Sequence, residues 1–248
     1  MRLRRVILTS LSHFDVSPFR NLGYTPVKVS TIRLSPNRIE ISKLTKNLLE
    51  GVHDSAAFLS PRSIRMINPS IEVIEVLSKM RLFAVGHSTK ESLEEFGLRN
   101  IEVPNEYTSG ALATLIVGQH LKLPFSSIAL IRSGFADKIM YNELVANGVP
   151  AREYRIYSPE VDPYGVERLL EELRFGADFV VFTSRSSFEL VRNFLQPKVC
   201  SELKSLLERS NLIAIGPETA KSLREFGLEP FVVADHSLRG VLSFLKVM

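Results

Sequence analysis

Residues 81–112 read RLFAVGHSTKESLEEFGLRNIEVPNEYTSGAL, and residues 211–242 read NLIAIGPETAKSLREFGLEPFVVADHSLRGVL. The two stretches align without a gap at a constant offset of 130 residues. Each passes from a short apolar run through a glycine into an amphipathic pattern, which is typical of a strand followed by a helix. The repeat therefore predicts one β-α arrangement that occurs twice. Identical pairs include Gly86/Gly216, Thr89/Thr219, Ser92/Ser222, Leu93/Leu223, Glu95/Glu225, Phe96/Phe226, Gly97/Gly227, Leu98/Leu228 and Gly110/Gly240.

The duplication continues toward the N-terminus. The apolar run at 6–9 resembles the run at 128–132. A repeated unit of roughly 120–130 residues is too long for a solenoid, whose repeats span about 20–50 residues. We therefore expect two similar lobes with a cleft between them. A weaker match at an offset of 124 pairs Asp54, Phe58, Ser60 and Ser63 with Asp178, Phe182, Ser184 and Ser187.

Short apolar runs alternate with amphipathic stretches along the chain. Continuous apolar runs are typical of strands buried on both faces of a parallel sheet. At 91–96, apolar residues three apart lie between charges, as on a helix with one buried face. The alternation predicts the α/β class, with doubly wound parallel sheets in two duplicated lobes. The expected strands lie at 6–8, 56–59, 83–85, 128–131, 179–182 and 212–215.

Two extended segments occupy corresponding places in the duplication and indicate crossings between the lobes. Residues 27–33 alternate apolar and polar side chains before Ser35-Pro36, and residues 151–157 do so before Ser158-Pro159. Proline disfavours helix at the preceding residue and often ends an element. We expect both segments to stop at these prolines, while the pattern leaves open which strands join which lobe.

The composition is that of a globular protein with a weakly basic surface. The 248 residues are 45% hydrophobic and 23% charged, with a formal net charge of +4 and pI ≈ 9.2. This charge favours anionic ligands. Lys and Arg form no basic block and there is no Trp, so nucleic acid is not indicated.

Targeting and membrane segments are not expected. No apolar run approaches the ~18–20 residues of a membrane helix, and the run after the basic residues 2–5 is too short for a signal peptide. The single cysteine, Cys200, excludes an internal disulfide and a multi-thiolate metal site. These features fit a cytoplasmic protein.

A Gly-x-x-Thr turn joins a strand to a helix in both copies of the repeat. A helix start at the carboxyl end of a parallel strand presents free N–H groups and partial positive charge, and so binds anions. The alternative is simple capping, because Ser88-x-x-Glu91 has the form of a capping box and Pro217 suits the first helical position. The turns contain Gly86 and Thr89 in the first copy and Gly216 and Thr219 in the second.

A second pair of strand-to-helix junctions contains hydroxyls and an arginine. Ser60 and Arg62 lie in one junction, and Ser184 and Arg185 lie in the other. Hydroxyl, N–H and guanidinium groups together suit a carboxylate. The alternative is again structural, since Ser60 before Pro61 is typical of a helix N-cap.

Tyr157 ends the second extended segment. It fits a half-buried strand residue whose hydroxyl reaches water. It also fits a phenol that donates a proton or hydrogen bond to a ligand.

Other catalytic patterns are missing from the sequence. The histidines 13, 53, 87, 120 and 236 show no metal-ligand spacing. There is no Gly-x-Ser-x-Gly elbow, Walker loop or Gly-x-Gly-x-x-Gly fingerprint. We expect neither a metal nor a cofactor.

The chain contains AVGHST at 84–89, IRS at 131–133, IY at 156–157, FTS at 182–184 and AIGPET at 214–219. In order and spacing these segments resemble the uroporphyrinogen-III synthases, and the resemblance covers nearly the full chain. The resemblance implies two flavodoxin-like lobes joined by a two-stranded linker near 27–36 and 151–159. Lobe 1 would comprise 1–33 and 160–248, and lobe 2 would comprise 34–159.

The resemblance also implies a reaction: cofactor-free closure of hydroxymethylbilane, a tetrapyrrole with eight carboxylates, to uroporphyrinogen III and water. Ring D would be inverted, and Tyr157 would assist loss of the substrate hydroxyl. One departure is that the first strand ends in Thr9-Ser10, where many members have Thr-Arg. The residues expected to bind substrate are Ser60, Arg62, Gly86, Thr89, Arg132, Ser184, Gly216 and Thr219.

The chemistry agrees with this modest set of residues. A hydroxymethylpyrrole reacts readily once its hydroxyl leaves, so the enzyme must mainly hold geometry. The resemblance further implies a monomer, with hydroxymethylbilane synthase as an upstream partner. Two rival interpretations are a non-catalytic two-lobed binding protein for an anionic metabolite and a nucleotide- or flavin-dependent enzyme.

Overall fold

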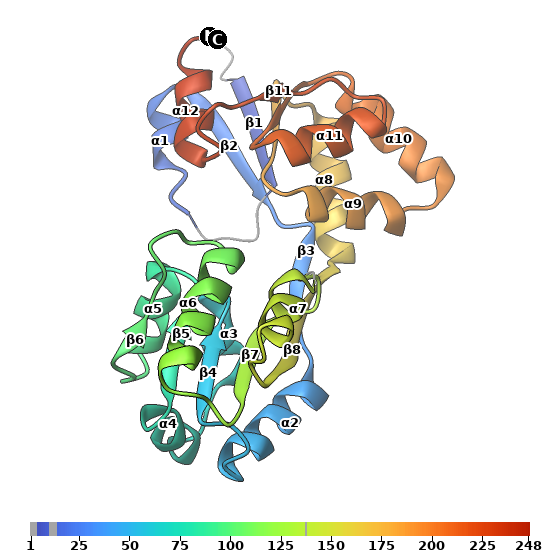
Figure 1. Cartoon of the computed structure of the whole chain (residues 1–248). Coiled ribbons are helices and arrows are strands. Elements are labelled where there is room, and N and C mark those ends of the chain that lie inside the picture. Colours follow the sequence, from blue (N-terminus) through green and yellow to red (C-terminus); the bar gives the residue numbers. More distant parts are fainter. Residues whose placement is uncertain (1–3, 10–13, 137) are drawn as a thin grey trace. The chain divides into compact units, whose positions relative to one another are not determined.

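The computed structural model describes residues 4–9, 14–136 and 138–248 (Figure 1). It divides into two compact units: unit 1 comprises Met1–Arg33 and Pro159–Met248, and unit 2 comprises Leu34–Ser158. The chain passes between the units twice, within β3 (Ile32–Pro36) and within β8 (Ala151–Val161). These two strands are hydrogen-bonded neighbours.

Unit 1 is built on a five-stranded sheet in the order β11-β10-β9-β1-β2. All of its strand pairs are parallel. One apolar core packs the sheet against α8 to α11, and a second packs its other face against α1 and α12. The strands are β1 (Arg4–Thr9), β2 (Tyr24–Val29), β9 (Phe179–Phe182), β10 (Asn211–Ala214) and β11 (Phe231–Val232). The helices are α1 (Ser17–Asn21), α8 (Pro163–Phe175), α9 (Arg185–Phe194), α10 (Pro197–Leu207), α11 (Pro217–Glu225) and α12 (Leu238–Leu245).

Unit 2 contains a six-stranded sheet in the order β3-β8-β7-β4-β5-β6. Helices α2 to α5 cover one face and α6 and α7 the other, again with a core on each side. The remaining strands are β4 (Ser55–Phe58), β5 (Arg81–Ala84), β6 (Ile101–Glu102) and β7 (Ile128–Ser133). The helices are α2 (Arg38–Leu49), α3 (Arg62–Ile67), α4 (Ile71–Ser78), α5 (His87–Glu94), α6 (Ser109–Lys122) and α7 (Ile139–Ala146).

The two sheets share one topology under a circular permutation. Numbered along the chain, the strands of unit 1 lie in the order 2-1-3-4-5 when read from β2, which is the flavodoxin-like order. Unit 2 gives the same order from β8 to β6 if its numbering starts at β7. In this correspondence β4, β5 and β6 match β9, β10 and β11, as the sequence repeat predicts. The predicted two-lobed α/β fold class is confirmed.

The six predicted strand positions are confirmed, whereas the segment at 27–33 is not one strand. It divides at Ser30 and Thr31, so that β2 joins the unit 1 sheet and β3 joins the unit 2 sheet. Ser30 Oγ donates to the Ile32 carbonyl at 2.8 Å. Helix α8 lies so close to this break that a Cβ added to Gly165 would be 1.8 Å from the Ser30 carbonyl oxygen. Ser30 and Thr31 therefore separate two strands that belong to different sheets.

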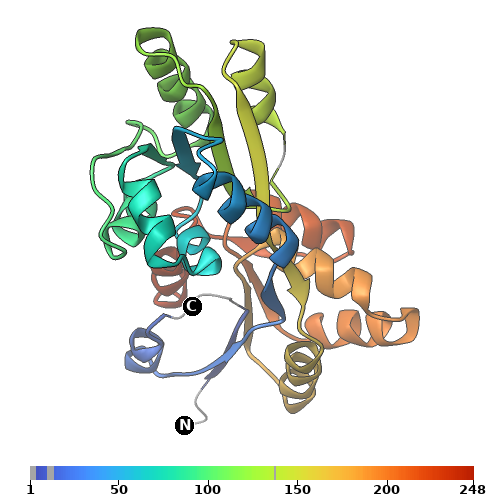
Figure 2. The ribbon, with the colours of Figure 1, turned by 90° about the horizontal axis from the view of Figure 1, so that it is seen from below.

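The prediction that the second extended segment stops at Ser158-Pro159 is also wrong. The 11-residue strand β8 continues to Val161 (Figures 1 and 2). Its register with β7 ends at the pair Ser133 and Tyr157. Proline lacks the N–H that a ladder needs, but Pro159 lies beyond this register and costs no bond to β7.

Candidate functional site

The two Gly-x-x-Thr turns have the same backbone geometry. Gly86 and Gly216 are the N-cap residues of α5 and α11, with φ/ψ of −172°/175° and −165°/173° and no side-chain cap. Pro217 occupies the first turn, as predicted. The capping-box interpretation is wrong, because α5 begins at His87 and Ser88 is already helical. In neither turn does the side chain of the N-cap residue accept a hydrogen bond from the first N–H groups of the helix. These donors are therefore available to an anion.

The threonine of each turn is buried at the start of its helix. Thr89 is 1% exposed and Thr219 is 4% exposed. The Thr89 N–H donates to the Gly86 carbonyl at 3.1 Å, but its Oγ1 is buried without a hydrogen-bond partner. A buried hydroxyl without a partner is uncommon and costly. Thr89 therefore has an unused donor and acceptor in the first turn of α5.

An aromatic ring lies over each of the two glycines. A Cβ on Gly86 would lie 3.2 Å from Cβ and Cγ of Tyr107, whose ring also meets His87 edge-on with centroids 5.2 Å apart. The ring of His236 lies 3.8 Å from the corresponding point on Gly216. The two turns are thus covered by rings of different size and polarity.

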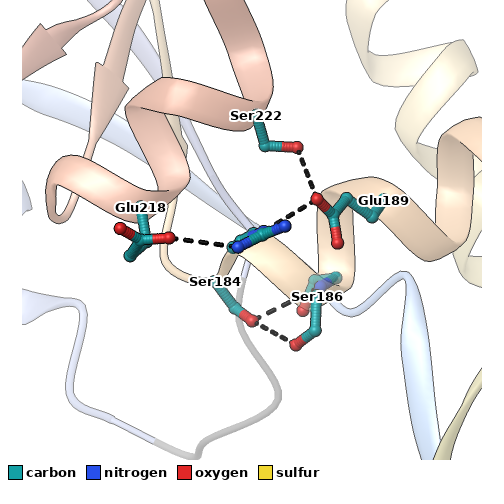
Figure 3. Close-up of polar contacts among 7 residues, drawn as sticks. Ser184, Ser186, Glu189, Glu218 and Ser222 are labelled. Carbon is teal, nitrogen blue, oxygen red and sulfur yellow. Dashed lines mark hydrogen bonds and ion pairs between the residues drawn. The ribbon is translucent and has the colours of Figure 1, made fainter. Parts of the chain in front are cut away.

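The second pair of junctions also lies at helix starts. Ser184 is the N-cap of α9 and its Oγ accepts from the Ser187 N–H at 3.3 Å (Figure 3). The prediction that Ser60 is the N-cap of this helix is wrong by one residue. Helix α3 begins at the exposed Arg62, and its N-cap is Pro61. The Ser60 Oγ still accepts from the Arg62 N–H at 3.2 Å.

Within each unit the two kinds of turn are neighbours, because they follow adjacent strands. β4 pairs with β5, which places the Ser60 junction beside the Gly86 turn. β9 pairs with β10, which places the Ser184 junction beside the Gly216 turn. The structure therefore brings together the predicted residues of each unit at the carboxyl edge of its own sheet.

Arg185 contacts carboxylates of the protein itself. Its Nε lies 2.8 Å from Glu189 and its Nη1 lies 3.0 Å from Glu218, which joins α9 to α11 (Figure 3). Ser222 Oγ also bonds to Glu189 at 3.3 Å. The hydrogen bond and charge of Glu189, followed by those of Glu218, raise the pKa of the Arg185 guanidinium. A substrate carboxylate at Arg185 would have to compete with Glu218.

Two further predicted residues, Arg132 and Tyr157, lie in unit 2 and are buried. Arg132 is 3% exposed and pairs with Glu153 at 2.8 Å. Tyr157 is 5% exposed and packs in a core that includes Phe58 and Ile131. Tyr157 is therefore more buried than the half-buried strand residue that the sequence suggested, because the fold packs most of its side chain in this core.

Ser10, where the family pattern differs, lies outside the described residues. Its neighbour Thr9 is buried, and Thr9 Oγ1 donates to the Val181 carbonyl at 2.9 Å. Within residues 4–9, 14–136 and 138–248, no group of His, Cys, Asp and Glu side chains has the arrangement of a metal site. No helix in the same ranges is long and apolar enough to cross a membrane.

Sequence reasoning missed two grooves at corresponding places in the repeat. A cavity of about 690 Å³ lies between the β6–α6 loop and α6, and one of about 320 Å³ lies between the β11–α12 loop and α12. The constant offset of 130 residues is the signal that would have revealed them. The lining pairs at this offset are Val103/Val233, Pro104/Ala234, Asn105/Asp235 and Thr114/Phe244.

Comparison with known proteins gives one consistent family. Residues 16–238 match the family described as "Uroporphyrinogen-III synthase HemD". A relative from Methanocaldococcus jannaschii, provisionally named a uroporphyrinogen-III synthase, is 23% identical over 229 residues, covering 91% of this chain and 90% of the relative. A relative of the same provisional name from Methanothermobacter thermautotrophicus is 30% identical over 167 residues, covering 66% and 64%.

Two solved structures have the same fold. A uroporphyrinogen III synthase from Thermus thermophilus aligns with a TM-score of 0.61 and 23% identity over 97% of this chain and 96% of its own. A uroporphyrinogen-III synthetase from Helicobacter pylori aligns with a TM-score of 0.65 and 14% identity over 99% and 100%. At these identities the structural likeness supports the two-lobed α/β fold.

Proposed function

The chain belongs to the uroporphyrinogen-III synthase family, and from this premise we propose that it closes hydroxymethylbilane into uroporphyrinogen III. The reaction inverts ring D and releases one water, which makes the enzyme a cyclising hydro-lyase. No other reactant is needed, because the substrate supplies both the leaving hydroxyl and the attacking carbon.

The single observation that supports this proposal most is the repeated glycine-capped turn. Each unit has a helix start with free N–H groups and a buried threonine at the carboxyl edge of its sheet. Such turns favour carboxylates through N–H donation and the helix dipole. A ligand with eight carboxylates suits a protein that repeats this element. The residues proposed to bind them are Ser60, Arg62, Gly86, Thr89, Ser184, Gly216 and Thr219.

Tyr157 is the proposed catalytic residue. Its phenol O–H donates to the departing hydroxyl of the substrate, which leaves as water. The pyrrole nitrogen stabilises the resulting cation, and the substituted α-carbon of ring D attacks it to form a spiro intermediate. The bond from that carbon to its original methylene bridge then breaks, and the bridge re-bonds to the free α-carbon of ring D. The proton lost from this carbon returns to the phenolate, so that the only by-product is water. Burial in a core holds the phenol in a narrow range of positions, which favours one geometry of closure.

Control of geometry is the main task of the enzyme in this proposal. Without an enzyme, the activated bilane closes to the uninverted type I product. Charge-assisted hydrogen bonds contribute about 1.5–3 kcal/mol each, so several carboxylate contacts together select one folded form of the substrate. This agrees with a site of hydroxyls and N–H groups.

The test is to incubate the protein with enzymatically generated hydroxymethylbilane and to separate the oxidised porphyrin isomers by chromatography. We expect the type III isomer to dominate. A product of type I alone, equal to that formed without protein, would refute the proposed activity and favour the non-catalytic binding protein.

The same proposal includes the setting of the enzyme. We expect a cytoplasmic monomer that receives its substrate from hydroxymethylbilane synthase. Mixing the two purified enzymes and measuring both the sedimentation of the complex and the yield of type III product tests the partnership.

A further inference from the structure

An irregularity in β8 determines which face of the sheet receives Tyr157. The pairing of β7 with β8 runs regularly to Arg132 and Arg155, and then pairs Ser133 with Tyr157. Ile156 is therefore an extra residue opposite β7, which is the arrangement of a β-bulge.

The bulge reverses the direction of Tyr157. Side chains alternate along a regular strand, so Tyr157 should lie on the same face as Glu153 and Arg155. Instead it joins the core that contains Tyr154 and Ile156. One extra residue has moved the proposed catalytic phenol from one face of the sheet to the other.

A cluster of three charges lies on the face that Tyr157 has left. Arg132 Nη1 lies 2.8 Å from Glu153 Oε1, and Arg155 Nη2 lies 3.3 Å from Glu153 Oε2. The Glu153 side chain is 13% exposed. Breaking such a buried pair is costly, and one established use of buried ion pairs is to select a single arrangement of the chain.

The cluster is connected to the bulge through the β7–α7 turn. Arg155 Nη1 donates to the Gly134 carbonyl at 3.1 Å, and the Gly134 N–H donates to the Tyr157 carbonyl at 2.7 Å. On the side of β8 that faces β3, the Asn37 N–H donates to the Ile156 carbonyl at 2.8 Å. Both residues of the bulge are therefore held by the backbone.

The β7–α7 turn packs closely against β8 at Gly134. A Cβ on Gly134 would lie 2.2 Å from Ser158 Oγ and 3.5 Å from the Tyr157 carbonyl oxygen. A side chain at position 134 would therefore require the Ser158 hydroxyl to rotate away.

We propose that Arg132, Glu153, Arg155 and Gly134 form a positioning device that maintains the β8 bulge and so places the phenol of Tyr157. This inference rests on the proposed function of Tyr157. It also assigns a role to Arg132 that differs from direct substrate binding: its guanidinium acts through Glu153.

The test compares Glu153→Gln in two backgrounds, with Tyr157 and with Tyr157→Phe. In the first, we expect kcat to fall about 10- to 100-fold, because a misplacement of about 1 Å can cost on the order of 100-fold. KM should change less than about threefold, as for loss of an interaction made mainly in the transition state. In the Tyr157→Phe background, Glu153→Gln should cause no further loss of kcat.

Glu95→Gln is the matched control. Glu95 pairs with Arg65 at 2.6 Å on the surface of the same unit, and we expect its removal to leave kcat unchanged in both backgrounds. Glu153→Gln leaves Arg132 buried without its partner and so risks misfolding. Arg155→Gln is therefore the second variant, since the Arg155 side chain is 35% exposed and its loss frees the Gly134 carbonyl directly.

Two results would overturn the positioning role. One is full additivity, in which Glu153→Gln and Arg155→Gln lower kcat equally with and without the phenol. The other is a wild-type kcat for Arg155→Gln in a folded protein. In both cases the unmodified enzyme still makes the type III product. If the proposed function itself fails, the unmodified enzyme makes only type I, so the two failures are distinguishable.

Discussion

At the scale of the residue, Thr89 and Tyr157 are two buried residues whose hydroxyls have different proposed roles. Thr89 Oγ1 lies without a partner under the turn that begins α5, and it is one of several groups proposed to hold carboxylates. Tyr157 is the one residue proposed to act on the leaving hydroxyl. If one carboxylate-binding group is lost, the remaining contacts still hold the substrate, whereas no other group is proposed to replace the phenol.

We therefore expect Tyr157→Phe to lower turnover more than any other single change, by about 100-fold or more, within the range of general acid catalysis. Thr89→Ala should cost less than this, at most the ~1.5–3 kcal/mol of one hydrogen bond to a charged group, because the other carboxylate contacts remain. Steady-state kinetics with product isomer analysis measures both. An equal or larger loss in Thr89→Ala would contradict the role of Tyr157.

His53 affects stability rather than chemistry. It is 3% exposed, and its ring nitrogens lie 2.8 Å from Ser127 Oγ and 2.7 Å from the Tyr154 hydroxyl. Burial and then the nearby Arg152 lower the pKa of His53. The unfolded chain therefore binds a proton more readily than the folded protein, below the usual pKa of about 6.5.

The sign of the pH effect follows from this difference. The contribution of neutral His53 is fully present above pH ~6.5 and is lost as the pH falls from there toward the lower folded-state pKa. We expect the free energy of unfolding in urea to decrease between about pH 7 and pH 5. In His53→Gln, which keeps a donor and an acceptor but does not titrate, this decrease should be smaller. An unchanged slope would show that other groups cause it.

At the scale of the element, the two copies of the glycine-capped turn have the same backbone conformation but different neighbouring side chains. Gly86 and Gly216 have nearly the same φ and ψ and both cap their helices. Neither has a positive φ, so alanine is allowed by the backbone at both positions. The difference lies in the ring above each glycine, Tyr107 or His236.

This pair of glycines supplies its own control. Gly86→Ala should lower the free energy of unfolding by about 1 kcal/mol, at the low end of overpacking costs, because its Cβ meets Tyr107 at 3.2 Å. Gly216→Ala has no such clash and should lose only the preference for glycine over alanine at an N-cap, roughly 0.5–1 kcal/mol, which Gly86→Ala loses in addition to its clash. Urea unfolding of both variants measures this, and Gly86→Ala combined with Tyr107→Ala should recover most of the loss.

At the scale of the whole molecule, each unit has its own sheet with a core on both faces. The chain connects the units only twice, within β3 and β8. Separate cores are the usual basis of separate cooperative units, for which a single two-state transition is not expected.

We expect two calorimetric transitions that respond to different mutations. Leu48 in α2 and Leu207 in α10 are both fully buried, one in each unit, and truncation to alanine costs about 2–5 kcal/mol at such sites. Leu48→Ala should lower the transition of unit 2 and Leu207→Ala that of unit 1. A single transition that moves equally in both variants would show that the units unfold together.

Local pattern in the sequence determined the elements and the duplication. Buried parallel strands, amphipathic helices and glycine turns depend on residues close together in the chain, and the runs at 128–131 and 179–182 already identify β7 and β9. The two glycine-capped turns were predictable for the same reason, because a repeat preserves a local motif in both copies.

Only the tertiary structure decided the features that depend on partners far away in the chain. The division of 27–36 into β2 and β3, the permuted strand order and the pairing of Arg132 with Glu153 all require knowledge of which strands meet. The bulge at Ile156 is of the same kind, since an extra residue exists only relative to a neighbouring strand. A side chain's face can be read from alternation while a strand is regular, and Tyr157 lies where that regularity is broken by contacts with β7.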